Sequence, residues 1–253
     1  MSQTPTPTGT APVGRKSPYN GDEIAIIGMA LRVPGANTPE QFWQRLADGD
    51  ACFSPLSDEA LLANGVSAHQ LNDPRLVKLD TAMADIEQFD PRFFGLSSFD
   101  ATLMDPQYRH FLELAWEALE SAGQVPNTFN GTIGVYAGSG QNTYLLHHLM
   151  RDAHLVREPG HWYLRHVGND KDFMTTRASF HLDLKGPSVN IQTACSTSLV
   201  AIHMAAQALL SRECDMALAG GITIICPPRQ GYLAQEGGIE DPRGECRSFD
   251  ASS

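Results

Sequence analysis

The stretch that decides the fold is residues 189–224, which reads VNIQTACSTSLVAIHMAAQALLSRECDMALAGGITI. Its beginning has the apolar character of a short buried strand, and residues 199–211 are apolar on nearly every side. A helix that is apolar all round is normally a buried one. Residues 216–225 predict a second buried strand, in which Gly220 and Gly221 indicate a bulge or a close backbone approach. The stretch therefore predicts a strand, a buried helix and another strand.

Cys195 lies at the junction between the first strand and the helix. Free N–H groups and the positive end of the helix dipole favour an anion there, and they lower the pKa of a thiol. The same N–H groups can hold the oxyanion that forms when sulfur attacks a carbonyl. The arrangement is the thiol counterpart of the strand–nucleophile–helix turn of hydrolases, without its flanking glycines. A buried structural cysteine is the common alternative, and position alone leaves both interpretations open.

The rest of the chain alternates predicted strands and helices. We expect buried strands at residues 23–30 and 132–138, and helices at residues 39–48, 106–122, 143–150 and 173–182. The clearest helix starts at Asp105-Pro106, a cap followed by proline, and stops at Gly123. Residues 52–80 predict loops with a short helix, and residues 155–172 predict a loop. This alternation predicts an α/β domain with a mostly parallel sheet.

Composition narrows the function classes. The net charge of −11 argues against nucleic-acid partners and against an anionic membrane surface. The chain has five cysteines, an odd number, and lacks a C-x-x-C pair, which favours a reducing and therefore cytoplasmic compartment. Residues 1–22 are rich in Pro, Thr, Gly and Ser, so we expect a flexible leader rather than a signal peptide. The longest uncharged stretch, residues 186–211, is too interrupted for a membrane span.

Several polar groups predict structural roles rather than sites. The loop at residues 138–142, GSGQN, lacks the lysine of a phosphate-binding loop, so a structural crossover is expected. His154, His161 and His166 are too loosely spaced to predict a metal site. The glutamates of residues 113–120 are expected on a solvated helix face. We predict neither a bound cofactor nor a metal.

The motif TACSTSL at residues 193–199 closely resembles the active-site stretch of β-ketoacyl synthases, in particular the ketosynthase domains of modular type I polyketide synthases. Further matching motifs follow the order of that family, namely EIAIIGMALRVPGA, FDPRFFGLSS, DPQYRHFLELAWEALESAG, LDLKGPSVNIQTACSTSLVAIHMA, MALAGGITI and GECRSFDAS. The resemblance covers nearly all of residues 23–253. It implies a thiolase-like fold with α-β-α-β-α layers, of which this chain holds the first half and the start of the second. Such domains normally work as homodimers.

The resemblance also implies a mechanism. Cys195 would take an acyl group from the phosphopantetheine thioester of an acyl carrier protein, and its own backbone N–H would be one oxyanion donor. A carbanion made by decarboxylating malonyl-acyl carrier protein would then attack the acyl-enzyme. The product would be a β-ketoacyl thioester that is one two-carbon unit longer. Since some loading-module relatives have glutamine in place of the cysteine, this chain resembles the condensing kind.

Some features depart from the family pattern. The resemblance implies two catalytic histidines beyond Ser253, so we expect the sequence to be part of a larger domain and the 253 residues alone to condense nothing. We also expect the helix after Cys195 to be partly uncovered. His203, two turns along that helix, is expected to be a packed core histidine. Tyr108, where relatives often have glutamine, and the loop GSGQNTY predict altered substrate choice or altered packing only.

Two alternatives stay open. One is a cysteine hydrolase or thioesterase, which would need a histidine within hydrogen-bond reach of Cys195. The other is a non-catalytic ketosynthase-like half that serves dimerisation or carrier-protein docking.

Overall fold

The computed structural model describes residues 21–81, 83–157, 162–228 and 231–251. The expected flexible leader falls on residues 1–20, outside the described residues, apart from its last two positions.

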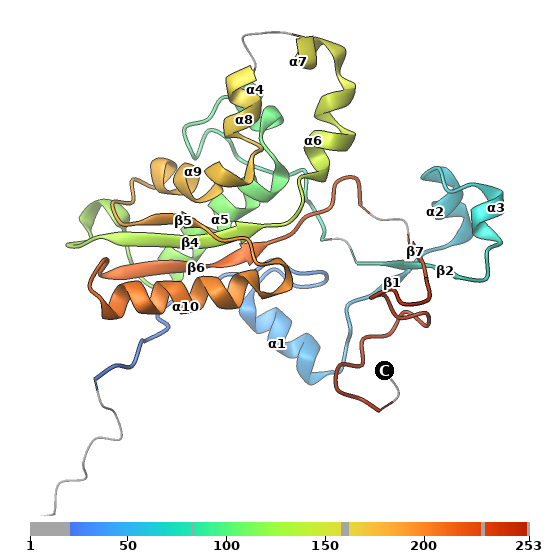
Figure 1. Ribbon diagram of the computed structural model, residues 1–253, viewed down its shortest axis with the longest axis horizontal. Helices are drawn as coiled ribbons and strands as arrows, with labels where there is room; N and C mark the ends of the chain where they lie inside the picture. Colours follow the sequence, from blue (N-terminus) through green and yellow to red (C-terminus); the bar gives the residue numbers. More distant parts are fainter. Residues whose placement is uncertain (1–20, 82, 158–161, 229–230, 252–253) are drawn as a thin grey trace, which may run out of the picture.

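A parallel three-stranded sheet forms the centre of the fold (Figure 1). Its order is β5 (Ser188–Asn190), β4 (Ile133–Ser139) and β6 (Met216–Ile222), and every residue of β4 is buried. The register places Val135 opposite both Ser188 and Leu218. The strands predicted at residues 132–138 and 216–225 are therefore confirmed, and so is the parallel sheet.

Helices cover both faces of this sheet (Figure 1). On one face α10 (Thr197–Leu210) packs against Tyr136, whereas on the other α5 (Pro106–Ser121) and α9 (Met174–His181) pack against Val135 and Ala137. This follows from the strand period, because successive side chains point to opposite faces. The structure thus shows an α-β-α unit of the expected layered fold.

The long helix α5 forms as its sequence signals predict. The Asp105 side chain accepts a hydrogen bond from the Gln107 N–H at 2.9 Å, and Pro106 is the first helical residue. The helix ends before Gly123, whose φ of +65° suits a residue without a side chain. Leu112, Ala115 and Leu119 are among the residues that it buries in the largest core cluster.

Shorter elements surround this unit. The helices are α1 (Pro39–Ala47), α2 (Asp58–Ala63), α3 (Ala68–Leu71), α4 (Ser98–Leu103), α6 (Thr143–His147), α7 (Ala153–Arg157) and α8 (Trp162–Val167). The 3-10 turns are η1 (Pro126–Thr128), η2 (Leu149–Arg151), η4 (Lys171–Phe173) and η5 (Ala194–Ser196). Two small antiparallel pairs join β1 (Ser54–Pro55) to β3 (Leu79–Asp80) and β2 (Leu76–Val77) to β7 (Tyr232–Leu233). Residues 52–80 thus contain two helices and three short strands.

The strand predicted at residues 23–30 is wrong. These residues belong to no strand, and Ile26 is 82% exposed. The segment lies along α5 instead, where the Met29 N–H donates to Ser121 Oγ at 3.4 Å. Gly28 permits this approach, because a Cβ there would lie 2.4 Å from the Ala118 carbonyl oxygen. An apolar run becomes a strand only where a neighbouring strand offers its backbone groups, and among the described residues none pairs with this one.

The loop predicted at residues 155–172 is also wrong, because this region contains α8 and η4 and the end of α7. For α7 the missed signal is Asp152, which precedes the helix. Its carboxylate accepts hydrogen bonds from the backbone N–H groups of His154 at 2.8 Å and Leu155 at 3.2 Å. Such a side chain satisfies the free N–H groups of a helix start.

The helix α10 is less buried than its composition predicts. Its sheet-facing side consists of Ala201, Ala205 and Ala208, while Leu199 is 70% exposed and Ile202 53% exposed. Alanines let the helix approach the sheet closely. Val200 and Leu209 pack beside them, whereas the side chains of Leu199 and Ile202 are mostly exposed. The expectation of a partly uncovered helix is confirmed.

Two further expectations about this region need correction. His203 is exposed rather than packed in a core. The glycine pair of β6 forms no bulge, because Gly220 and Gly221 continue the ladder opposite Ala137 and Gly138. No close approach requires a glycine here either: a Cβ on Gly221 would make an ordinary contact, 3.5 Å from Cβ of Ser198 in α10, and one on Gly220 would meet nothing within 4 Å.

The expected solvated face of α5 holds only for Glu120. Glu113 lies 3.2 Å from Nδ1 of His110, and Glu117 forms a two-bond ion pair with Arg32. One bond of that pair joins Arg32 Nη1 to Glu117 Oε2 at 2.7 Å. The pair ties the segment before α1 to α5, and its hydrogen bonds raise the pKa of the Arg32 guanidinium.

We expect a double-mutant cycle of Arg32→Ala and Glu117→Ala to give a coupling free energy of about 1 kcal/mol in urea unfolding. The matched control is the pair of Lys185 and Asp183, whose side chains are 65% and 61% exposed, against 22% for Arg32. That cycle should give close to zero, because water screens an exposed pair. Equal coupling in both cycles would contradict the anchoring role.

Candidate active site

Cys195 sits in the tight turn between β5 and α10, as the sequence predicts. The helix begins two residues earlier than expected, at Thr197. The hydroxyl of Thr197 accepts a hydrogen bond from the Thr193 N–H at 3.0 Å and donates one to the Ala194 carbonyl at 2.8 Å. The Ser196 hydroxyl donates to the Thr193 carbonyl at 2.8 Å. These local side-chain bonds hold the turn in place.

The turn contains one left-handed residue directly before the cysteine. Ala194 has a φ of +54°, a region in which a residue with a Cβ is uncommon and costs about 1–2 kcal/mol. Such strain often marks functional sites. Cys195 itself lies in η5, two residues before α10 begins, and is exposed and free of any disulfide. Its role as nucleophile, and that of its N–H as oxyanion donor, stay predictions.

The end of β4 packs directly against the turn that carries Cys195. A Cβ on Gly138 would lie 1.8 Å from the Ile191 carbonyl oxygen and 2.5 Å from Cγ2 of Thr197. Only a residue without a side chain fits there, so the backbone of β4 reaches the residues that flank Cys195. In the loop that follows, a Cβ on Gly140 would lie 3.0 Å from Oε1 of Gln107. The glycines of the GSGQN loop therefore serve close packing.

Sequence reasoning missed the amide side chains that hold this loop. Gln107 is fully buried, and its Nε2 donates to Asp105 Oδ2 at 2.9 Å and to the Gln141 carbonyl at 3.4 Å. Further along the loop, Nδ2 of Asn142 donates to the carbonyl and to Oδ1 of Asn169, both at 2.9 Å. Apart from the Asp105 contact, the partners of these amides lie far along the chain, so the local sequence does not distinguish the amides from solvated ones.

Tyr108 has a packing role. Its side chain is 3% exposed, and its hydroxyl donates to the carbonyl of Asp170. Burial, followed by the nearby charge of Asp105, raises the pKa of the phenol well above its usual range. The tyrosine therefore stays neutral and joins the start of α5 to the turn before α9.

The other cysteines differ from Cys195 in their surroundings. Cys214 is buried between β4 and α10, and burial raises the pKa of its thiol. Burial likewise raises the pKa of the half-buried Cys226. A raised pKa keeps a thiol protonated and unreactive. Cys246 is the second exposed thiol among the described residues and is the natural comparison for Cys195.

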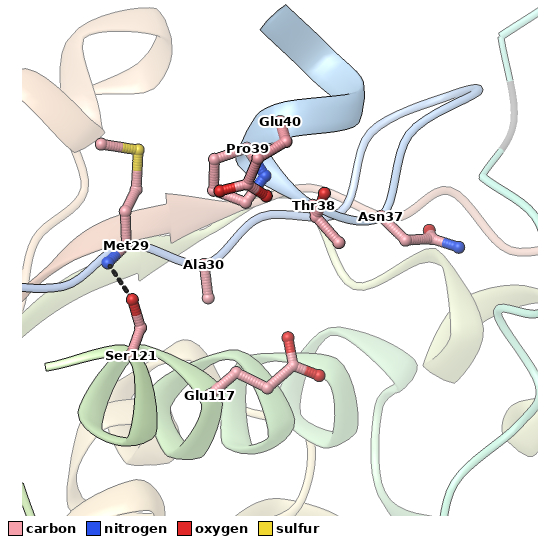
Figure 2. Close-up of a pocket in the computed structure, with 8 residues that line it drawn as sticks. All are labelled: Met29, Ala30, Asn37, Thr38, Pro39, Glu40, Glu117 and Ser121. Carbon is pink, nitrogen blue, oxygen red and sulfur yellow. Dashed lines mark hydrogen bonds between the residues drawn. The ribbon is translucent and has the colours of Figure 1, made fainter. Parts of the chain in front are cut away.

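A cavity of about 400 Å³ lies away from this turn, between α5 and the segment that leads into α1 (Figure 2). Figure 2 shows Glu117 and Ser121 rising from α5 toward Met29 and Ala30. Cys195 does not line it. Glu117 is the charged residue that α5 contributes to this cavity, and its carboxylate is already paired with Arg32.

Two further findings concern the described residues alone. No three His, Cys, Asp or Glu side chains gather there in a way that could hold a metal ion. None of the helices in the described ranges combines the length and the apolar character that crossing a membrane requires.

Comparison with known proteins identifies the family. The family model described as "Beta-ketoacyl synthase, N-terminal domain" matches residues 21–253. The chain belongs to the β-ketoacyl synthase family. The match contains both the Cys195 turn and the sheet that carries it, so the family resemblance stated from the motifs is confirmed.

The curated relatives are polyketide synthases. A subunit of the phenolphthiocerol/phthiocerol polyketide synthase of Mycobacterium tuberculosis is 45% identical over 232 residues, which are 90% of this chain and 16% of that protein. Polyketide synthase GfsE of Streptomyces halstedii is 38% identical over 262 residues, 98% of this chain and 6% of the relative. This ketosynthase chain thus spans a sixth or less of the length of these proteins.

The solved structures agree with the fold. Ketosynthase twelve of the bacillaene polyketide synthase of Bacillus amyloliquefaciens superposes with a TM-score of 0.85 at 32% identity, covering 92% of this chain and 40% of that one. The ketosynthase from module 1 of the bacillaene synthase of the same species gives a TM-score of 0.73 at 31% identity, covering 93% and 39%. Ketosynthases have the thiolase-like α/β fold, so the predicted fold class is confirmed.

Proposed function

We propose that this chain supplies the nucleophile of a ketosynthase that forms carbon–carbon bonds by decarboxylative condensation in polyketide chain elongation. The observation that carries the proposal is Cys195, an exposed thiol after a strained residue at the start of α10. The family match and the polyketide-synthase relatives support it. More finely, the activity is that of a 3-oxoacyl-acyl carrier protein synthase.

The first step is acyl transfer. The thiolate of Cys195 attacks the carbonyl carbon of an acyl thioester carried on the phosphopantetheine of an acyl carrier protein. A bond forms from Sγ to the acyl carbon, the bond from that carbon to the pantetheine sulfur breaks, and the pantetheine leaves as a thiol once it takes up a proton. The backbone N–H of Cys195 stabilises the oxyanion in between. Sulfur suits the role, because it is both a good nucleophile and a good leaving group.

The second step makes the carbon–carbon bond. Malonyl-acyl carrier protein loses carbon dioxide, and the electron pair of the broken bond attacks the acyl carbon on Cys195. The bond from Sγ to that carbon then breaks and regenerates the thiolate. The chain needs no resident cofactor for either step. The partners of the complete enzyme are an acyl carrier protein and a second copy of the ketosynthase.

Intact-mass spectrometry with a butyryl-pantetheine thioester tests the first step. We expect one butyryl adduct per chain, mapped to Cys195, and its loss in Cys195→Ala. The matched control is Cys246→Ala, which removes the other exposed thiol and should keep the adduct. An adduct that persists in Cys195→Ala, or one shared equally with Cys246, would contradict the proposal.

The same experiment separates the alternatives. An adduct on Cys195 that water removes within minutes favours a hydrolase. A folded chain that stays unlabelled but binds acyl carrier protein favours a docking half.

A further inference from the structure

A second cavity, of about 510 Å³, lies where the chain leaves the carboxyl ends of β4 and β6. Gln141 and Thr143 come from the segment after β4, and Thr223, Ile225 and Pro227 from the segment after β6. His147 of α6 and Arg151 of η2 complete its lining. In Figure 1 both segments leave the same end of the sheet at which α10 begins. In open α/β sheets, ligands bind at the carboxyl ends of the strands.

The polar groups of this cavity suit an anion. His147 and Arg151 are four residues apart and both are exposed. No carboxylate of the described residues pairs with Arg151, although the chain is acidic overall. A guanidinium presents a planar fork of N–H donors that matches a carboxylate or a phosphate. The imidazole and the hydroxyls of Thr143 and Thr223 add further donors.

Two features show that the cavity wall is organised. The Cys226 N–H donates to Thr143 Oγ1 at 2.8 Å, which joins the two segments across the cavity wall. Cγ2 and Oγ1 of Thr223 would both lie within 3.0 Å of a Cβ on Gly140, so that threonine packs against the loop after β4. Ile225 and Pro227 contribute an apolar wall beside these donors. The volume lies within the ordinary range for small-molecule sites.

We propose that this cavity binds a small organic oxyanion, namely a carboxylate or a phosphate on a short apolar chain. Arg151 binds the oxygens, His147 and the threonine hydroxyls donate to them, and Ile225 and Pro227 cover the apolar part. The proposal goes beyond the proposed function, because Cys195 is not among the lining residues and the site needs no acyl transfer.

Isothermal titration of the full chain in low salt tests this assignment with glutarate, inorganic phosphate and the uncharged diamide of glutarate. We expect saturable binding of glutarate or phosphate and none of the diamide. Arg151→Gln should weaken the binding about tenfold or more, because a charge-assisted hydrogen bond is lost. The matched control is Arg75→Gln, which removes an exposed arginine that does not line the cavity and should leave the affinity unchanged.

Comparing the titrations with glutarate and with phosphate identifies the chemical class of the ligand. Tighter binding of glutarate assigns a carboxylate with an apolar chain, whereas tighter binding of phosphate assigns a phosphate group. Binding of neither anion overturns the proposal, and so does an equal loss in Arg75→Gln. Either result leaves the labelling of Cys195 untouched, so failure of this cavity and failure of the proposed function are distinguishable.

Discussion

Replacing Gly138 by alanine is expected to lower the free energy of unfolding by about 3 kcal/mol or more and to abolish acylation of Cys195. The added methyl group would lie 1.8 Å from the Ile191 carbonyl oxygen, a distance that no side-chain rearrangement can relieve. It would also lie 2.5 Å from Cγ2 of Thr197, whose hydroxyl closes the nucleophile turn. The strand or the turn must therefore move.

The measurement is urea unfolding together with the butyryl-labelling assay. Gly220→Ala is the matched control, because Gly220 lies opposite Ala137 on the neighbouring strand and a Cβ there meets nothing within 4 Å. Its free energy of unfolding should change by less than about 1 kcal/mol, and its labelling should persist. Equal midpoints for the two variants would show that β4 does not support the turn.

Replacing Leu119 by alanine is expected to lower the free energy of unfolding by about 3 kcal/mol. This α5 side chain is 2% exposed and belongs to the core cluster between α5, α9 and the sheet. Truncation removes buried methyl groups and leaves a cavity that the surrounding helices fill only in part.

The same truncation at Leu199 should change stability by less than about 0.5 kcal/mol. Leu199 is 70% exposed on α10, and alanine is at least as good a helix former. Both variants remove the same atoms, so the difference between their free energies of unfolding in urea reports the difference in burial. A large loss at Leu199 would mean that the outer face of α10 is covered in solution, for instance by a second copy of the chain.

Local signals in the sequence predicted much of the fold. The strand at β4, the capped helix α5 and the turn at Cys195 all depend on neighbours within a few residues. The signals are the short continuous run of apolar and small residues in β4, the Asp105-Pro106 cap with Gly123 after α5, and the motif around Cys195. The same signals failed from α7 to residue 172; Asp152 caps α7, but no strong apolar period follows it.

The candidate site was only half predictable. Cys195 and its turn follow from the motif at residues 193–199, whereas the contacts that hold the turn join distant parts of the chain. Gly138 meets Ile191, and Gln107 bonds the loop after β4. No local pattern marks these residues, because the constraint is the space left by another element.

By itself, the sequence determined the three strands of the central sheet and the long helices beside them, the capped ends of α5, the family and the place of the thiol before α10. The tertiary structure alone decided which face of α10 is buried. Its large apolar side chains suggested complete burial, yet three alanines face the sheet and Leu199 points away. It also decided that residues 23–30 lie along α5 rather than in the sheet. The physical reason is the same in both cases. Hydrophobicity indicates that a segment can be buried, but it becomes buried only where another element offers a surface of the right shape or free backbone groups.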